Sequence, residues 1–330
     1  MRARQLFNLL MREAGIGLAL ALMAALFSIF APRFASLANL TNIFTQISIN
    51  TVISVGMTFV ILLGGIDLSV GSVLALATVV GGLVITHEGW PATLAVPAAV
   101  AASMAVGMLC GLFNGAVSER WKIHSFIVTL GMLNIARGAA LEISNSRTIF
   151  SFPESFNDVG SMTVAGIPII FLIAVLAVAA GRFILQRTVF GRKIYAIGNN
   201  EEAVRLSGHA PWRTKVAAYT VCGAMVGVAA VMYMMRLNIA SPILGSGFEL
   251  NAIAAVVIGG TSMSGGKGSM VGTFLGACIM GVLNNGLLLL GMGDFARLMV
   301  TGLIIVVAVV IDKYRARAFV QTSFEPGRQA

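Results

Sequence analysis

A succession of ten apolar runs constrains this sequence more than any other feature. The runs cover residues 15–31, 41–63, 68–86, 92–117, 125–144, 167–185, 216–235, 250–258, 271–290 and 295–311. Crossing the hydrocarbon core of a bilayer, about 30 Å thick, takes about 20 apolar residues in a helix. Charged residues make up 11% of the chain, against about a quarter in soluble proteins. We therefore predict an all-α, polytopic membrane protein with about ten transmembrane helices, in one transmembrane domain over residues 1–330.

The eighth run, residues 250–258, is too short to span a bilayer by itself. We expect it to reach full depth only together with irregular backbone on either side, which membranes tolerate where that backbone is buried in protein or lines a cavity. Shortened helices of this kind often lie at transport sites.

The distribution of Lys and Arg predicts the orientation of the chain, because positive residues remain on the cytoplasmic side of a membrane. With the N-terminus inside, cytoplasmic segments hold 17 of the 22 Lys and Arg residues. This topology divides the chain into a cytoplasmic start (1–14), six spans (15–185), a cytoplasmic segment (186–215), four spans (216–311) and a cytoplasmic tail (312–330). Both termini are therefore predicted to be cytoplasmic, and the multi-pass chain to contact membrane lipid.

A glycine-rich stretch around Lys267, VVIGGTSMSGGKGSMVG at residues 256–272, invites comparison with a phosphate-binding loop. Such a loop needs Gly, four residues and then Gly-Lys-Ser/Thr. Here Thr261 occupies the first glycine position and Gly268 follows the lysine, so both ends of the pattern fail. The longest hydrophilic segment, 186–215, is also too small for a nucleotide-binding domain. We expect no bound cofactor and no ATP hydrolysis by this chain alone.

The glycines of this stretch instead predict a tightly turning connection at the cytoplasmic face, where backbones pack closely. Residues 60–72, VILLGGIDLSVGS, form a weak repeat of it, because both stretches end an apolar run in Gly-Gly and reach Gly-Ser before the next run. We predict related elements in the two halves of the chain; the alternative is a simple loop between spans. The predicted glycine turns contain Gly64, Gly65, Gly259, Gly260, Gly265 and Gly266.

Asp67 lies in the first of these elements, near the end of a span. An intramembrane carboxylate is costly unless it is solvated or paired, which makes it a candidate for a functional site. One interpretation is that Asp67 caps the third helix by accepting from backbone N–H groups near Ser69 and Val70. The other is a role in gating or coupling, and the two are compatible.

Several longer motifs resemble a known family. GGIDLSVGSVLAL at 64–76, GRKIYAIGNNEEAVRLSG at 191–208, GFELNAIAAVVIGGTSMSGGKGSMVGTFLGA at 247–277 and LNNGLLLLG at 283–291 are similar to the permeases of ribose-type monosaccharide ABC importers. The resemblance implies a pathway formed with a second permease chain, expected to be a homodimer, in the bacterial inner membrane. It also implies a periplasmic sugar-binding protein and a separate cytoplasmic ABC ATPase subunit. Which pentose, hexose or polyol is carried stays open.

Given this resemblance, the cytoplasmic segment 186–215 is expected to contact the ATPase. Its centre predicts a short amphipathic helix with an asparagine at the N-cap, acidic residues in the first turn, where they suit the helix dipole, and a glycine at the end. Apolar side chains would enter a groove on the ATPase while charged ones fix the register. The alternative is an ordinary surface helix. The candidates are Asn199 or Asn200 as the N-cap, Glu201, Glu202 and Arg205 for register, Val204 and Leu206 for the groove, and Gly208 as the stop.

Neutral polar side chains within the spans are candidates for the translocation pathway, because a neutral sugar is held by hydrogen bonds and apolar packing without a counter-charge. Each amide has a structural alternative, a hydrogen bond between helices that contributes about 1 kcal/mol. The pathway candidates are Asn50, Asp67, Asn114, Asn134, Asn251, Asn284 and Asn285. Arg137 and Glu142 of the fifth run are expected near the external interface, in a structural or docking role.

Two further patterns predict contact surfaces. Gly107, Gly111 and Gly115 recur at four-residue spacing, which is typical of a helix-packing seam. The external segments 145–165 and 236–249 carry charges that could pair with a binding protein, and the alternative is that they are solvated loops.

An ion-gradient-driven secondary transporter for a small polar solute is the alternative function. It would place ionisable groups at the membrane midplane, and here the middle of nearly every span is free of them. An enzyme would need a cluster of acid, base or nucleophile, whereas His87, His124 and His209 lie apart. The three cysteines show no metal-ligand spacing, and the net charge of +9 is spread over short loops. We therefore expect neither a metal nor nucleic acid.

Overall fold

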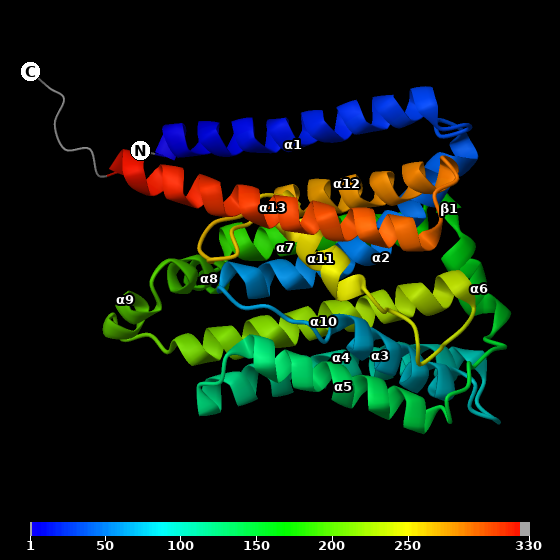
Figure 1. The fold of residues 1–330 in the computed structure, drawn as a ribbon. Coiled ribbons are helices and arrows are strands. Elements are labelled where there is room, and N and C mark those ends of the chain that lie inside the picture. The colour runs from blue at the N-terminus through cyan, green and yellow to red at the C-terminus, as the bar shows by residue number, and fades with distance from the viewer. Residues whose placement is uncertain (1, 324–330) are drawn as a thin grey trace, which may run out of the picture.

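The computed structural model describes residues 2–323, with side chains for 13–310 and for Lys313. Figure 1 shows a bundle in which most helices run along one direction. In chain order the elements are α1 (Arg2–Phe30), α2 (Leu37–Leu62), α3 (Val70–Ile85), α4 (Ala92–Trp121), α5 (Ser125–Ile143), α6 (Glu154–Ser161), β1 (Thr163–Val164), β2 (Ile167–Pro168), α7 (Ile169–Arg187), α8 (Val189–Asn199), α9 (Glu201–Leu206), α10 (Pro211–Leu237), α11 (Phe248–Ile258), α12 (Met270–Leu289) and α13 (Asp294–Ser323). The two strands pair antiparallel in a small hairpin.

The predicted apolar runs coincide with helices. Seven of the described helices are long and apolar enough to cross a membrane, namely α1, α2, α4, α5, α7, α10 and α12. Two other apolar helices are shorter: α11 has 11 residues, in keeping with the short eighth run, and α3 has 16. A membrane crossing at 68–86 stays a prediction, because the helix found there is shorter than the predicted run. The reason is local, because α2 ends at Leu62 and the chain turns through Gly64, with a φ of 78°, before α3 begins.

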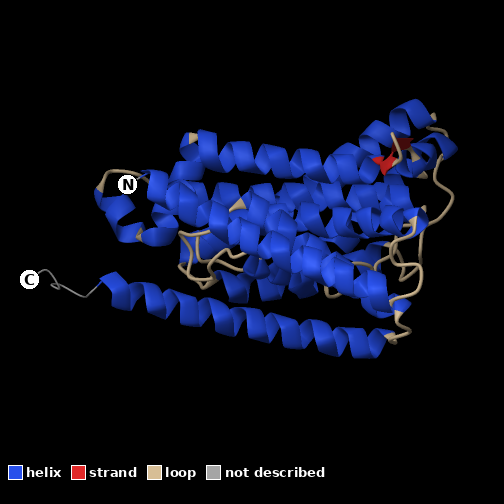
Figure 2. Ribbon diagram, turned by 90° about the horizontal axis from the view of Figure 1, so that it is seen from above, coloured by secondary structure: helices blue, strands red, loops and turns tan. Residues whose placement is uncertain are grey.

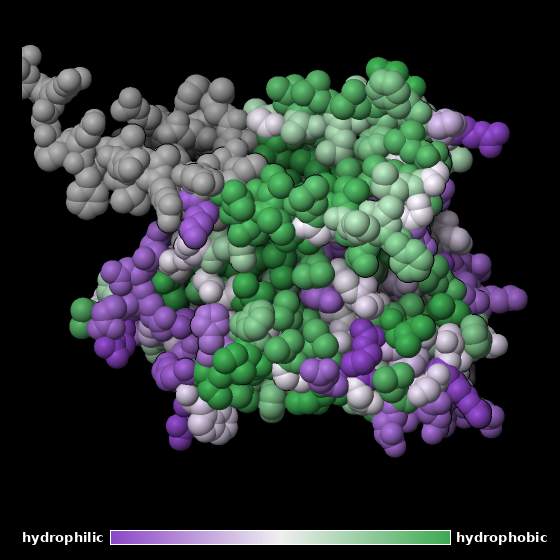
Figure 3. Space-filling view, in the orientation of Figure 1, coloured by the Kyte–Doolittle hydropathy of each residue, from purple (hydrophilic) through white to green (hydrophobic). Residues whose placement is uncertain are grey.

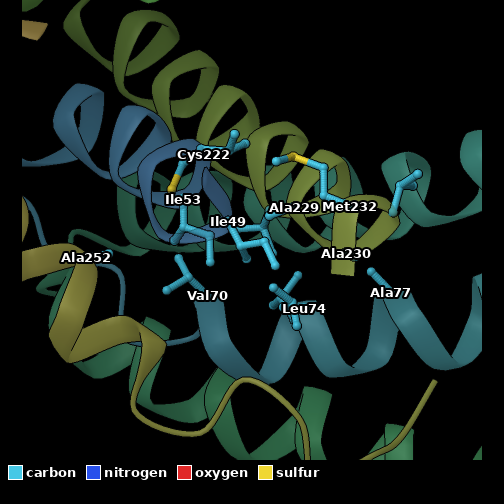
Figure 4. Close-up of a cluster of buried hydrophobic side chains, with 14 of the residues drawn as sticks. Ile49, Ile53, Val70, Leu74, Ala77, Cys222, Ala229, Ala230, Met232 and Ala252 are labelled. Atoms are coloured by element: carbon cyan, nitrogen blue, oxygen red, sulfur yellow. The ribbon is translucent and has the colours of Figure 1, made fainter. Parts of the chain in front are cut away.

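α2 lies at the centre of the bundle. Within its apolar window 83% is buried in the chain, whereas for α1 the corresponding share is 6%. α2 packs against α7, α10, α11 and α12, while α1 and α13 run along the outside (Figures 1 and 2). The core in Figure 4 joins Ile49 and Ile53 of α2 with Val70 and Leu74 of α3 and Ala230 of α10. The short α3 packs mainly against α4, α5 and α10.

α4 and α10 pack through glycines. A β-carbon on Gly107 would lie 2.1 Å from the carbonyl oxygen of Gly223, and one on Gly111 would lie 2.2 Å from that of Tyr219. Gly115 lies one turn further along the same contact. Because no side chain tolerates such distances, the predicted packing seam along α4 is confirmed, with α10 as its partner.

The two ends of the bundle carry different elements. The N-terminal end of α1, the C-terminal end of α13 and helices α8 and α9 lie at one end, and α6 with the hairpin lies at the other (Figure 1). In Figure 3 polar side chains gather toward both ends of this face, and apolar ones cover much of the surface between. The predicted cytoplasmic start 1–14 and tail 312–330 lie almost wholly outside the residues whose side chains are described.

Candidate functional site: an amide-lined cavity and the helix pair of residues 189–206

A cavity of about 220 Å³ lies between α2, α10, α11 and α12. Pockets for drug-sized ligands enclose about 300–1,000 Å³, so this one suits a smaller solute. It is lined by Gln46, Ile47, Ile49, Asn50, Tyr233, Arg236, Phe248, Asn251, Ala277, Met280, Gly281 and Asn284. The second helix of the chain and three consecutive later helices therefore build one site.

The cavity combines free hydrogen-bonding capacity with aromatic surface. The Asn50 Oδ1 atom is buried and accepts no hydrogen bond from any described residue. Asn284 Nδ2 donates to the Met280 carbonyl at 3.0 Å, within its own helix. The rings of Tyr233 and Phe248 lie 6.1 Å apart, with their planes tilted by 51°. A buried oxygen without a hydrogen-bond partner costs about 1–3 kcal/mol, which sets Asn50 apart from the other amides of this cavity.

Three predicted pathway residues meet at this cavity. Asn50 of α2, Asn251 of α11 and Asn284 of α12 all line it. The polar lining residues that sequence analysis missed are Gln46, Tyr233 and Arg236. A signal existed for Gln46, because it stands four residues before Asn50 and so lies on the same face of the helix.

The other four pathway candidates do not line this cavity. Asn285 exchanges hydrogen bonds of 2.9 and 3.0 Å with Asn39 of α2, which is the structural alternative for an intramembrane amide. Asn134 is exposed on α5 and donates to the Leu130 carbonyl. Asn114 and Asp67 belong to a separate buried cluster.

Asp67 closes a turn ahead of α3. Its Oδ1 atom accepts from the Ser69 N–H at 2.9 Å and from the Ser69 hydroxyl at 2.6 Å. Asn114 Nδ2 donates to Ser69 Oγ at 3.0 Å and lies 3.4 Å from Asp67 Oδ2. The predicted contact with the Ser69 backbone is confirmed, and the cluster joins the start of α3 to α4. A role of Asp67 in gating or coupling stays a prediction.

Arg137 of α5 holds the connection that leads into α11. Its Nη1 atom donates to the carbonyl of Pro242 and, at 2.8 Å, to that of Leu244. The expected structural role is confirmed for this residue, whereas Glu142 is exposed. By fixing the entry to α11, Arg137 supports the placement of Phe248 at the cavity.

The segment 186–215 forms two short helices, α8 and α9, where one was predicted. Asn200 is the N-cap of α9, and its Oδ1 accepts from the Ala203 N–H at 2.9 Å. Gly208, with a φ of 81°, follows the end of α9, and the His209 N–H donates to the Val204 carbonyl, as in a Schellman motif. The predicted N-cap and stop are therefore confirmed, with Asn200 rather than Asn199 as the cap.

The prediction that Val204 enters a partner groove is wrong. Val204 is 8% exposed, because it packs against this chain itself, whereas Leu206 is 78% exposed. Val204 and Leu206 are two residues apart, which corresponds to about 200° of rotation around the helix axis. Their side chains therefore point in opposite directions. The apolar groups that α9 and its surroundings do offer are Leu206 and Trp212, which is 50% exposed.

Lys215 joins α9 to the long helices. Its Nζ atom lies 2.7 Å from Glu201 Oε2 and 2.9 Å from Glu119 Oε1 of α4, and Glu119 also pairs with Lys122 at 3.0 Å. Glu202 and Arg205 pair on the outer side of α9 at 2.7 Å, and this hydrogen bond raises the pKa of Arg205. Sequence analysis missed Lys215 and Glu119, because their pairing depends on how separate helices pack.

The two predicted glycine turns meet. The Gly266 N–H donates to the Leu62 carbonyl at 2.9 Å, so the second turn is bonded to the end of α2. Positive φ angles occur at Gly64, Gly260, Gly265 and Gly266. Gly65 and Gly259 have ordinary φ angles, but added β-carbons would lie 2.4 Å from the Tyr219 hydroxyl and 2.3 Å from the Gly272 carbonyl oxygen. The predicted close packing of backbones is confirmed.

Comparisons with known proteins agree with this architecture. Residues 39–309 match the family described as the branched-chain amino acid transport system permease component. The ribose import permease protein RbsC of Escherichia coli K12 is 40% identical over 299 residues, 89% of this chain and 92% of that protein. RbsC of Bacillus subtilis 168 is 39% identical over 313 residues, which cover 94% of this chain and 95% of that protein. The L-arabinose ABC transporter permease protein AraH of Azospirillum brasilense is 33% identical over 306 residues, which cover 93% of this chain and 89% of that protein. No solved structure matches the chain.

The chain therefore belongs to this family of permease components. The resemblance to ribose-type sugar permeases, given above on its motifs, is confirmed. With its seven long apolar helices, the protein is a multi-pass permease of the cell membrane.

Proposed function

We propose that this chain is the membrane-spanning permease subunit of an ATP-driven, binding-protein-dependent importer for a monosaccharide or related polyol. The cavity carries the proposal, because its lining combines several neutral amides and two aromatic rings with a single charged residue, Arg236. Amide groups both donate and accept hydrogen bonds, as a neutral polyhydroxylated solute requires, and the aromatic rings offer apolar packing surface. The names of the sugar permeases that the chain resembles support the same solute class.

The proposed topology has about ten membrane-crossing helices, with the termini and α8–α9 in the cytoplasm. The short helices α3 and α11 complete their crossings with the turns beside them, which are buried in protein as the bilayer demands. A second copy of the chain completes the translocation pathway, and lipid surrounds the exposed apolar helices.

The proposed partner at the cytoplasmic end is a separate ABC ATPase subunit, which would hydrolyse the ATP. Leu206 and Trp212 provide exposed apolar groups for a groove on that subunit, and Glu202 and Arg205 lie beside them on the surface of α9. At the opposite end, the exposed Glu154 and Asp158 of α6 are candidates to contact a periplasmic sugar-binding protein.

Reconstitution tests this function. Liposomes holding the permease with its co-expressed ATPase subunit should accumulate radiolabelled ribose or arabinose only when ATP is enclosed with the ATPase and the binding protein is added outside. Permease alone should not transport under a proton or sodium gradient. Uptake driven by an ion gradient without the ATPase would instead support the secondary transporter.

A further inference from the structure

Three backbone segments meet at the end of the bundle that carries α8 and α9. They are the turn after α2, the turn between α11 and α12, and the last residues of α8. We name this meeting point the glycine junction and define it by Gly64, Gly198, Asn199, Gly265 and Gly266. Its first turn leads into the short helix α3, and its second follows the short helix α11. The junction therefore lies in the turn that precedes α3 and in the turn that follows α11.

Gly198 is wedged between the two turns. An added β-carbon would lie 2.0 Å from the Leu62 carbonyl oxygen and 2.4 Å from the Gly266 nitrogen. These two backbone atoms are themselves joined by the 2.9 Å hydrogen bond from Gly266 to Leu62. A β-carbon on Gly265 would likewise meet the Gly64 nitrogen at 3.0 Å and the Gly198 carbonyl oxygen at 3.1 Å. The end of α8 thus packs backbone to backbone on the end of α2 and on the second turn, which in turn lies against Gly64.

Side chains of α8 hold the second turn at two further points. Asn199 Nδ2 donates to the Gly266 carbonyl at 3.2 Å and to the Tyr195 carbonyl at 2.7 Å. The Tyr195 hydroxyl donates to the Gly268 carbonyl at 3.0 Å. Burial, reinforced by the charge of Glu13, raises the pKa of Tyr195 to about 12, so this hydroxyl keeps its proton at neutral pH. A displacement of α8 would therefore pull on the turn as well as push it.

Resting on the proposed function, in which α8 and α9 meet the ATPase, we propose that the glycine junction passes movement of this helix pair to α3 and α11 together, with Asn199 as a positioning residue. Close-packed atoms transmit displacement rather than absorb it, and glycines at positive φ allow the turns to pivot. Because α11 carries Phe248 and Asn251, movement at the junction reaches the cavity.

The test is G198A in the reconstituted complex of permease, ATPase subunit and binding protein. The ATPase subunit should still co-purify and hydrolyse ATP, while sugar imported per ATP hydrolysed falls about tenfold, within the usual range of coupling between sites. The matched control is G131A, since Gly131 lies on the exposed side of α5 with no described atom within 4 Å of an added β-carbon. Its import per ATP should equal that of the unmodified protein.

A second variant, N199D, keeps the side-chain shape but replaces the amide donor with an oxygen facing two carbonyls. Import per ATP should fall severalfold with co-purification unchanged. Normal import per ATP in G198A would overturn the glycine junction, and so would loss of the ATPase from G198A, which would make the residue part of subunit assembly. Failure of the unmodified chain to bind any ATPase would instead count against the proposed function.

Discussion

At the scale of single residues, the cavity is distinguished by one amide left without a partner. Most buried polar groups in proteins are hydrogen-bonded, and an exception calls for an explanation. Asn285 follows the rule through its pairing with Asn39, whereas Asn50 lines the cavity and its buried side-chain oxygen has no donor among the described residues. We interpret Asn50 as a residue whose partner arrives with the solute.

Replacing Asn50 with alanine should therefore weaken transport selectively. Loss of one hydrogen bond costs about 1 kcal/mol. The concentration of solute-loaded binding protein that gives half-maximal uptake should therefore rise about fivefold. N134A is the control, because Asn134 is exposed on α5 outside the cavity. Measurement of uptake against concentration in both variants checks this, and a defect in N134A with normal uptake in N50A would contradict the assignment.

At the scale of elements, two long helices pack closely because glycines, which have no side chain, line their contact. α4 and α10 approach until their glycines face backbone atoms, a geometry that in a membrane replaces the hydrophobic drive of water-soluble packing. Lys215 then joins α10 to α9 and α4 by ion pairs. Helix α9 is thus attached by ion pairs to the closely packed pair of α4 and α10.

Enlarging a glycine of this seam should destabilise the whole protein. In G111L the new side chain would collide with the Tyr219 backbone, and overpacking of this kind costs about 1–3 kcal/mol or more. We expect a lower thermal midpoint for the detergent-solubilised protein and less of it in the membrane. G131L on α5 has open space around it and should behave like the parent chain. Equal stability of the two variants would show that the seam matters little.

At the scale of the whole molecule, the termini-bearing ends of α1 and α13 share one end of the bundle with α8 and α9. The positive-inside rule assigns this end to the cytoplasm. The opposite end carries α6 and the hairpin, which would then face the periplasm.

Thiol labelling of intact cells can check this orientation. In a cysteine-free background, S207C beyond α9 should resist a membrane-impermeant maleimide until the cells are opened, and S161C at the end of α6 should react at once. Both serines are exposed, so neither result depends on unfolding. The reverse pattern would invert the topology, and equal labelling of both would argue against a spanning arrangement.

The sequence was sufficient for the long helices, because sustained apolar runs have few alternatives in a membrane, and for the caps of α9, because Asn200 and Gly208 act locally. It was insufficient where helix rotation decides the outcome. Val204 faces inward for that reason, and only three of the seven pathway candidates meet at the cavity. The search for apolar runs long enough to cross a bilayer also missed α6 and α8, because these short helices are amphipathic and not apolar throughout.

The loose attachment of α1 has a consequence for how the chain is made. The ribosome makes this helix well before its main neighbour, α12, which follows more than 200 residues later. Until α12 is made, α1 must be stable in the lipid without that neighbour. Leu18, Leu22 and Leu26 are each more than half exposed and give α1 an apolar surface for contact with acyl chains. Late capture by α12, through contacts such as the 2.6 Å hydrogen bond from Ser269 to Glu13, would then complete assembly.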